Sequence, residues 1–232
     1  MTPIHHYHND DKVMVAVDCI IFGFDSEGLK ILLIKRGFEP EKGKWSLMGG
    51  FLKKEENLDQ AADRVLKKLT GISNIYMEQL RSYSKVDRDP VERTISVSYF
   101  ALINKDDHDI ELTKEYDAQW FNLKELPQTI FDHPEMIERA LNVLRRKAVT
   151  YPLGFELLPE KFTMRQLQDL YECILGQELD KRNFINKVNS LDILIKLNEK
   201  DKSTSKKGAY LYRFNKDKYD NFVAKGNSFG LQ

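Results

Sequence analysis

The chain has 232 residues, enough for one large domain or two small ones, and 41% of them are hydrophobic, so a substantial core can form. Its 36 basic and 36 acidic residues cancel, so the total charge indicates no class of partner. The polar N-terminus does not resemble a signal peptide, no apolar run reaches the length of a membrane span, and Cys19 and Cys173 form no CxxC pair. We therefore expect a cytoplasmic protein with reduced thiols and no contact with a membrane, although the sequence leaves a disulfide between the two cysteines open.

The first part of the chain predicts a mixed α/β domain. Strands are expected at residues 13–24, 29–36, 75–84 and 94–103, where Val, Ile and aromatic residues are concentrated. Helices are expected at 58–69, closed by a glycine at 71, and from Pro134 to Ala148, where the proline suits the first helical position. The Pro and Gly of TYPLG (150–154) indicate a boundary, so we predict two domains, 1–149 and 150–232.

The segment GGFLKKEENLDQAADRVLKKLTGI at 49–72 resembles the box of the Nudix hydrolases, G-x5-E-x7-R-E-U-x-E-E-x-G-U, in which U is a bulky apolar residue. The residues that fall at the expected spacing are Gly50, Glu56, Arg64, Leu66, Gly71 and Ile72. Where the pattern has three further glutamates, the chain has Val65, Lys68 and Leu69. Glutamates at this i, i+3, i+4 spacing would share a helix face and could bind Mg²⁺. A valine and a leucine supply no ligand and a lysine repels a cation, so we expect a Nudix fold with no metal site and no hydrolysis.

Such a fold can still bind a small effector. Trp45 offers a ring for stacking, and Lys44, Arg64 and Arg93 can bond to hydroxyls or phosphates. The loop at 86–94 lies between two predicted strands, as binding loops often do. We predict an effector site from Lys44, Trp45, Arg64, Asp87, Arg88 and Arg93. The competing interpretation is a solvated charged loop and a tryptophan that belongs to the core.

The second part of the chain predicts a helix-turn-helix. Residues 181–232 carry 12 basic and 5 acidic side chains, a local excess that favours an anionic partner. Thr163 and Gln166 have the spacing of a capping box, an apolar stripe follows, and Gly176 ends this helix before Asp180 caps a second one at 181–190. The polar face of the second helix can read base edges in the major groove, although a polar face is more often merely solvated. The side chains predicted to contact DNA from it are Lys181, Arg182, Asn183, Asn186 and Lys187.

Two alternating segments, ILIKL at 193–197 and AYLYRF at 209–214, flank a polar, lysine-rich stretch. This pattern predicts a β-hairpin, or wing, with Lys206 and Lys207 positioned along DNA phosphates. Helix, turn, helix and wing together indicate a winged helix-turn-helix.

Both halves together resemble the Nudix-related transcriptional regulators, which join a usually inactive Nudix domain to a C-terminal winged helix. The string LLPEKFTMRQLQDLYECILGQELDKRNFINKV at 157–188 is similar to the C-terminal signature of that family. The resemblance implies an α/β Nudix fold followed by a winged helix-turn-helix, in a homodimer that binds a palindromic DNA operator, responds to a small effector and needs no cofactor. Because Lys68 and Leu69 stand where acidic residues would be, we favour the sugar-sensing branch and predict a repressor of carbohydrate catabolism whose effector is L-arabinose.

Three other functions stay open. The ADP-ribose branch of the same family would make the chain a sensor that controls NAD metabolism. A Nudix hydrolase with a displaced metal set would have to use Glu55, Glu56 and Asp59. The second domain could instead bind a protein, which its basic charge disfavours. The HHYH segment at 5–8 is interpreted as a tail rather than a DNA-binding arm.

Overall fold

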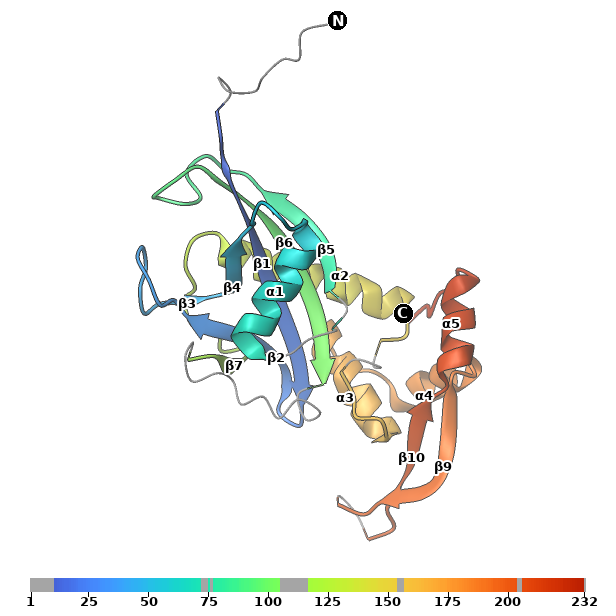
Figure 1. Ribbon diagram of the computed structural model, residues 1–232. Helices are drawn as coiled ribbons and strands as arrows, with labels where there is room; N and C mark the ends of the chain where they lie inside the picture. Colours follow the sequence, from blue (N-terminus) through green and yellow to red (C-terminus); the bar gives the residue numbers. More distant parts are fainter. Residues whose placement is uncertain are drawn as a thin grey trace, which may run out of the picture.

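The fold is described by a computed structural model over residues 11–71, 75, 77–104, 117–153, 157–203 and 206–231. A mixed sheet with helices on both faces joins a smaller unit of helices and a long hairpin (Figure 1). Among the described residues, the large sheet has the order β3-β2-β1-β6-β5, with β4 also paired to β1 and β7 to β2. Its strands are β1 (Met14–Asp25), β2 (Gly28–Lys35), β3 (Trp45–Ser46), β4 (Met48–Phe51), β5 (Met77–Tyr83), β6 (Thr94–Asn104) and β7 (Gln119–Asn122).

Strand β1 is the centre of this sheet and is buried on both faces. It pairs with β6 in parallel and with β2 and β4 antiparallel. Because side chains alternate along a strand, Ile20 and Phe22 enter the apolar core that contains α2, whereas Cys19 and Ile21 enter the core under α1. The helices α1 (Leu58–Thr70) and α2 (His133–Thr150) therefore lie on opposite faces of the sheet.

The second unit is a winged helix. Its elements are β8 (Phe162–Thr163), α3 (Met164–Leu175), α4 (Lys181–Ser190), β9 (Leu194–Asp201), β10 (Ala209–Phe214) and α5 (Lys216–Ala224). The predicted capping box is present, because Thr163 and Gln166 bond to each other's backbone N–H. Gly176 ends α3 in the left-handed conformation with a φ of 71°, and Asp180 caps α4.

The two units share one core. Leu167, Leu170 and Ile174 of α3 belong to the same buried cluster as Leu29 of β2 and the inner face of α2. The guanidinium of Arg145 on α2 donates from Nε to the carbonyl of Ile174 at 3.1 Å, at the end of α3. The predicted boundary at 149/150 falls in the last turn of α2, whose whole apolar face packs on this core.

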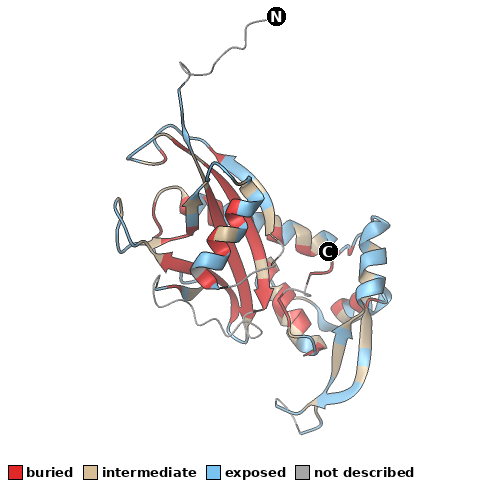
Figure 2. Cartoon of the chain, in the orientation of Figure 1, coloured by how far each residue is buried: buried red, intermediate tan, exposed pale blue. Residues whose placement is uncertain are grey.

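A tail at residues 226–231 returns to this junction. The N–H groups of Phe229 and Leu231 donate to the carbonyls of Thr150 and Val149 at 2.7 and 3.2 Å. The ring of Phe229 is 1% exposed and meets the ring of Tyr171 edge-on, with centroids 5.2 Å apart. The sheet and the junction are buried, whereas α5 and much of the wing are exposed (Figure 2).

Cys19 and Cys173, both in described segments, are free thiols, so the disulfide left open by the sequence does not form here. No helix of the described ranges is long and apolar enough to cross a membrane. The HHYH segment lies outside the described residues.

Candidate functional site

A cavity of about 280 Å³ opens beside the Nudix-like box. Its walls come from β1, β4, the end of β2, one side of α1, the loop before β6 and the first turn of α2. Among the described residues that line it, five are basic and two, Asp18 and Asp89, are acidic. The basic ones are Lys35, Arg36, Arg64, Lys68 and Arg88. This charge distribution suits an anionic ligand.

Glu56 and Arg64 of the box stabilise its backbone. Arg64 donates from Nε and Nη2 to the two carboxylate oxygens of Glu56 at 2.7 and 2.5 Å, and Nη2 also reaches the carbonyl of Phe51 at 2.9 Å. The N–H of Lys53 donates to Glu56 at 2.8 Å. The bonds from Arg64 lower the pKa of Glu56 from its ordinary 4.5 to about 2. The pair ties the loop after β4 to α1, with Arg64 at the edge of the cavity.

The positions that lack glutamates change what the box offers. Val65 is buried, and a Cβ added at Gly50 would lie 2.8 Å from its Cγ2, so the valine fills the space beside the glycine. Lys68 is exposed and lines the cavity; Leu69 is a residue whose side chain is not described. No group of three or more His, Cys, Asp or Glu side chains that could hold a metal ion is found in the described residues.

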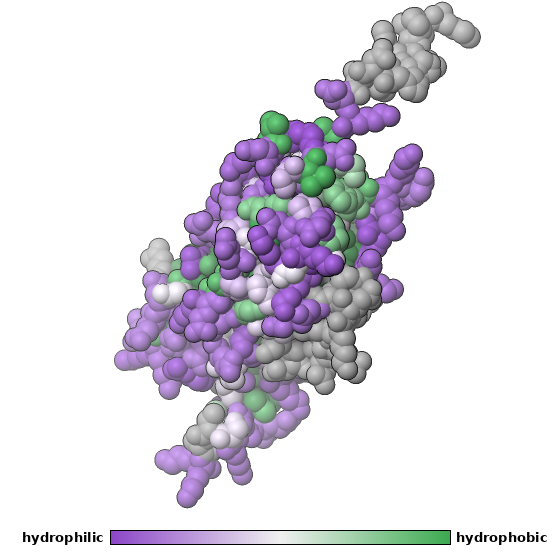
Figure 3. Space-filling view, turned by 90° about the vertical axis from the view of Figure 1, so that its left-hand side faces the viewer, coloured by the Kyte–Doolittle hydropathy of each residue, from purple (hydrophilic) through white to green (hydrophobic). Residues whose placement is uncertain are grey.

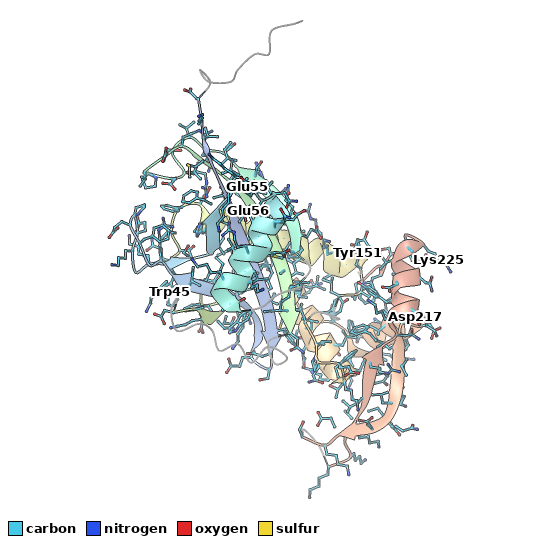
Figure 4. The ribbon with its side chains drawn as sticks, in the orientation of Figure 1. Trp45, Glu55, Glu56, Tyr151, Asp217 and Lys225 are labelled. Carbon is cyan, nitrogen blue, oxygen red and sulfur yellow. The ribbon has the colours of Figure 1, made fainter. Side chains whose placement is uncertain are left out.

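Two of the three acids proposed as a displaced metal set make hydrogen bonds to other side chains. Asp59 accepts a hydrogen bond from the hydroxyl of Tyr99 at 2.8 Å, while Glu56 is bound by Arg64. Glu55 is exposed, and Figure 4 shows it beside Glu56 at the start of α1.

A buried polar network forms the floor of the cavity. Arg88 makes two bonds to the carboxylate of Asp132, at 2.9 and 2.8 Å, and lies 3.6 Å from the carboxylate of Asp18. Ser96 donates to Asp18 at 2.5 Å. Asp132 stands at the N-cap of α2 but makes no side-chain capping bond, since Arg88 takes its carboxylate. The network thus uses the start of α2 to position a guanidinium in the cavity.

His133 adds a hydrogen-bonding group of defined orientation. Its Nδ1 accepts from the N–H of Leu47 at 3.1 Å, so in the neutral ring the proton is on Nε2, which lies 3.7 Å from Asp18. Burial lowers the pKa of His133 and keeps the ring neutral, against the opposing effect of Asp18.

The rim of the cavity carries aromatic rings. The guanidinium carbon of Arg36 lies 4.0 Å from the ring centroid of Phe38 and 5.4 Å from that of Phe131. Phe38 is 58% exposed. Sequence reasoning did not select these three residues or His133, because they become neighbours only through the sheet and the turn before α2.

The six residues predicted for effector binding separate into two groups. Arg64 and Arg88 line the cavity, whereas Lys44, Trp45, Asp87 and Arg93 are outside its lining. The ring of Trp45 meets that of Phe121 at 4.7 Å and packs against the core. Arg93 donates to the carbonyls of Ser84, Lys85 and Thr94 and so holds the loop before β6. Lys44 pairs with Glu41, and Asp87 is exposed.

The winged helix carries the predicted DNA-binding residues on its surface. Lys181, Arg182, Asn183 and Asn186 of α4 are exposed, while Phe184 and Val188 are buried in the core. Lys187 is half-buried, and its ammonium lies near Gly230 of the tail. Lys206 and Lys207 are exposed in the turn of the wing. Two further lysines, Lys196 and Lys200, lie over the ring of Tyr210 at 3.8 and 4.6 Å on one face of the wing.

This architecture defines a class of protein, in which a NUDIX domain is joined to a DNA-binding winged helix. Residues 12–140 match the family described as the NUDIX domain, and residues 154–214 match the NrtR DNA-binding winged helix domain. A relative from Acinetobacter baylyi, described as an ADPR responsive transcriptional repressor, is 35% identical over 211 residues, which cover 89% of this chain and 84% of the relative. The chain belongs to the NrtR family.

Other comparisons agree with this assignment. The structure of Shewanella oneidensis NrtR bound to a 27mer DNA has a TM-score of 0.78 and 30% identity, and the match covers 89% of this chain and 95% of that one. The NUDIX domain of that protein with ADP ribose matches 60% of this chain and 94% of its own length, with a TM-score of 0.54 and 28% identity. An ADP-ribose pyrophosphatase from Methanocaldococcus jannaschii is 38% identical over 125 residues, which cover 53% of this chain and 70% of the enzyme.

Proposed function

We propose that the chain is a transcriptional repressor whose NUDIX domain binds ADP-ribose without hydrolysing it, and whose DNA binding changes when it does. The observation that carries the proposal is the basic lining of the cavity beside a box in which three of the glutamates are replaced. This effector replaces L-arabinose, since the Acinetobacter relative is described as ADPR responsive and the NUDIX domain of Shewanella oneidensis NrtR forms a complex with ADP ribose. The sugar branch inferred from the resemblance has no support among them.

The charge of the ligand explains the substitutions in the box. A NUDIX hydrolase binds a diphosphate through metal ions that its glutamates hold. A lysine at position 68 supplies positive charge to the diphosphate directly, and Val65 closes the place of a metal ligand. Such a site binds the diphosphate but lacks the ion that would activate water. A sensor needs this combination, because a ligand that is consumed cannot report its concentration.

Binding measured by calorimetry with a chelator present tests this proposal. We expect ADP-ribose to bind equally well with EDTA and with Mg²⁺. Lys68→Glu should weaken binding about tenfold or more, because it reverses a charge at the cavity. Lys67→Glu is the matched control: Lys67 is the preceding residue on α1, is exposed and is outside the lining, so affinity should stay within about twofold. Equal losses in both variants would mean that general surface charge, not the site, binds the ligand.

The DNA-binding half is tested by gel shift on genomic fragments. We expect salt-sensitive binding, since the basic residues of α4 and the wing release counterions from the phosphates. Addition of ADP-ribose should change the shift at concentrations near the Kd that the calorimetry gives. An intact complex at saturating ADP-ribose would contradict the effector role. We also propose a cytoplasmic homodimer on a palindromic operator, to be tested by light scattering with and without operator DNA.

Hydrolysis is the second candidate, because the archaeal relative is an ADP-ribose pyrophosphatase. It would need a metal set from Glu55, Glu56 and Asp59, of which Glu56 and Asp59 are already bonded to Arg64 and Tyr99. Incubation of ADP-ribose with the protein and Mg²⁺ separates the two functions. Steady release of AMP and ribose 5-phosphate that EDTA abolishes would show that the protein is a hydrolase and would contradict the proposed sensor.

A further inference from the structure

We propose that Arg36, Phe38 and Phe131 form a stacking subsite for the base of a nucleotide effector and thereby determine that the site accepts a base-containing diphosphate rather than a bare one. The inference rests on the proposed function for the diphosphate end of the ligand. The subsite itself stands on its own geometry.

The loop that carries Phe38 is closed at its base. The N–H of Arg36 donates to the carbonyl of Lys44 at 2.9 Å, and the N–H of Gly43 donates back to Arg36 at 2.7 Å. Nε of Arg36 donates to the carbonyl of Phe38 at 3.2 Å. These bonds orient the loop that projects between β2 and β3 (Figure 1) and hold Phe38 over the cavity. A side chain held this way loses little freedom when a ligand binds.

One guanidinium lies against two rings. The guanidinium carbon of Arg36 is 4.0 Å from the centroid of Phe38 and 5.4 Å from that of Phe131, so cation–π attraction holds the group together. Arg36 is half-buried, and this partial removal from water lowers the pKa of its guanidinium. The guanidinium therefore acts as a fixed planar surface rather than as a mobile surface charge.

Exposure of Phe38 points to a missing partner. The side of the molecule from which this loop projects is mainly hydrophilic (Figure 3), yet Phe38 lines the cavity while 58% exposed. Exposed apolar side chains at the mouth of a cavity with a few polar groups are typical of ligand sites. A flat heteroaromatic ring would cover the apolar area and stack on a ring or a guanidinium plane.

Phe131 supports the same interpretation through its backbone. Its φ is 51°, a left-handed conformation that is unfavourable for a bulky residue. The turn is held on both sides, because the N–H of Ile130 donates to Trp45 and that of His133 donates to Ile130. Strain maintained by its surroundings is concentrated at functional sites. Here it places the Phe131 ring in the cavity wall, edge-on to His133 at 5.9 Å.

The cavity thus has two chemically different walls. Arg64 and Lys68 come from the box helix and suit phosphates, whereas the stack comes from the β2–β3 loop and the turn before α2 and suits a flat ring. A ligand that carries a base and a diphosphate can use both.

The experiment compares Phe38→Ala with the unchanged protein by calorimetry. The probes that carry a base are ADP-ribose and ADP, and the probe without a base is inorganic pyrophosphate. We expect Phe38→Ala to weaken both base-containing probes by about 5- to 100-fold, the range found when a stacking ring is replaced by alanine. Pyrophosphate should stay within about twofold. Phe38→Trp keeps a ring and should restore the affinity for ADP-ribose.

Phe51→Ala is the matched control. Phe51 is also an exposed phenylalanine in the cavity lining, but it lies on β4 beside Arg64. Its replacement should change ADP and pyrophosphate binding by the same factor. Phe38 and Phe51 are exposed, so both variants should unfold thermally like the unchanged protein in the absence of ligand.

The outcomes separate the two proposals. If the unchanged protein binds ADP-ribose and Phe38→Ala binds it equally well, the stacking subsite is wrong and the proposed function stands. If the protein binds ADP but not ADP-ribose, and Phe38→Ala loses ADP, the subsite stands and the effector is wrong. If ADP-ribose binds no more tightly than pyrophosphate, the subsite is wrong, and if ADP-ribose and ADP do not bind at all, both proposals are wrong.

Discussion

Replacement of Phe229 by alanine should loosen the attachment of the winged helix to the NUDIX domain. The ring is 1% exposed and lies at the junction of the two units, edge-on to Tyr171. Tyr171 in turn packs on Phe184 of α4, with centroids 5.5 Å apart. The ring of Phe229 therefore supports the helix that carries most of the predicted DNA-binding residues.

The magnitude follows from burial. Removal of a buried phenylalanine costs about 3–5 kcal/mol in free energy of unfolding, of which the edge-on ring pair accounts for roughly 0.5–1.5 kcal/mol. We expect a value near the lower end, about 3 kcal/mol, because the tail is held to α2 by two backbone bonds and can move inward to fill part of the space.

Urea denaturation followed by circular dichroism measures this loss. Val223→Ala is the control, since Val223 is 36% exposed on α5 and should cost less than about 0.5 kcal/mol. The DNA affinity of Phe229→Ala should fall as well, because α4 is no longer held in one position. A loss below about 1 kcal/mol would refute the reasoning, since it would mean that the tail does not occupy the junction in solution.

Other predictions concern pH and DNA. The pKa of Glu56 is depressed, so its pairing with Arg64 stabilises the fold above about pH 4.5, and this contribution is lost as the pH falls toward 2. The melting temperatures of Glu56→Gln and of the unchanged protein should therefore converge in acid. Burial lowers the pKa of His133, so the fold is most stable above the ordinary histidine pKa of 6.5, where the ring is neutral, and loses stability as the pH falls below that value. His133→Gln should therefore flatten the pH dependence of the melting temperature between about pH 7 and 5. Arg182→Ala should cost about 1–3 kcal/mol on the preferred operator, whereas Lys206→Ala should weaken operator and random DNA about equally in a gel shift. Equal losses on both DNAs for Arg182→Ala would contradict base reading by α4.

Local patterns predicted the elements that local interactions determine. The box helix was expected at 58–69 and spans Leu58–Thr70, and the second helix of the winged unit was expected at 181–190 and spans Lys181–Ser190. Caps and apolar periodicity are properties of neighbouring residues, which explains this agreement. The short strands β3, β4, β7 and β8 and the exposed helix α5 were not expected. The four strands exist because separate segments pair, as Met48 does with Cys19 of β1, and α5 has no buried residues and so no apolar stripe to detect.

The site was predicted less completely, for the same reason. Arg64 belongs to a motif and Arg88 to a charged loop, so both could be selected, and both line the cavity. Arg36, Phe38 and Phe131 belong to no motif and meet through tertiary structure. The preference for a sugar effector also had a physical weakness: the loss of metal-binding carboxylates shows how the charge of a ligand is neutralised, and it does not show that the ligand is uncharged.

The helix α2 contacts both the cavity and the winged helix, so it connects effector binding with DNA binding. Its first turn supplies His133 to the cavity, and its last turns hold the end of α3 through Arg145 and the tail through Thr150. Its 18 residues span about 27 Å as one rigid rod. By thermodynamic linkage, any factor by which the effector weakens operator binding is the factor by which the operator weakens effector binding. Under the proposed function, a repressor on its operator therefore responds at a higher ADP-ribose concentration than one free in solution, so the operator itself helps to set the threshold.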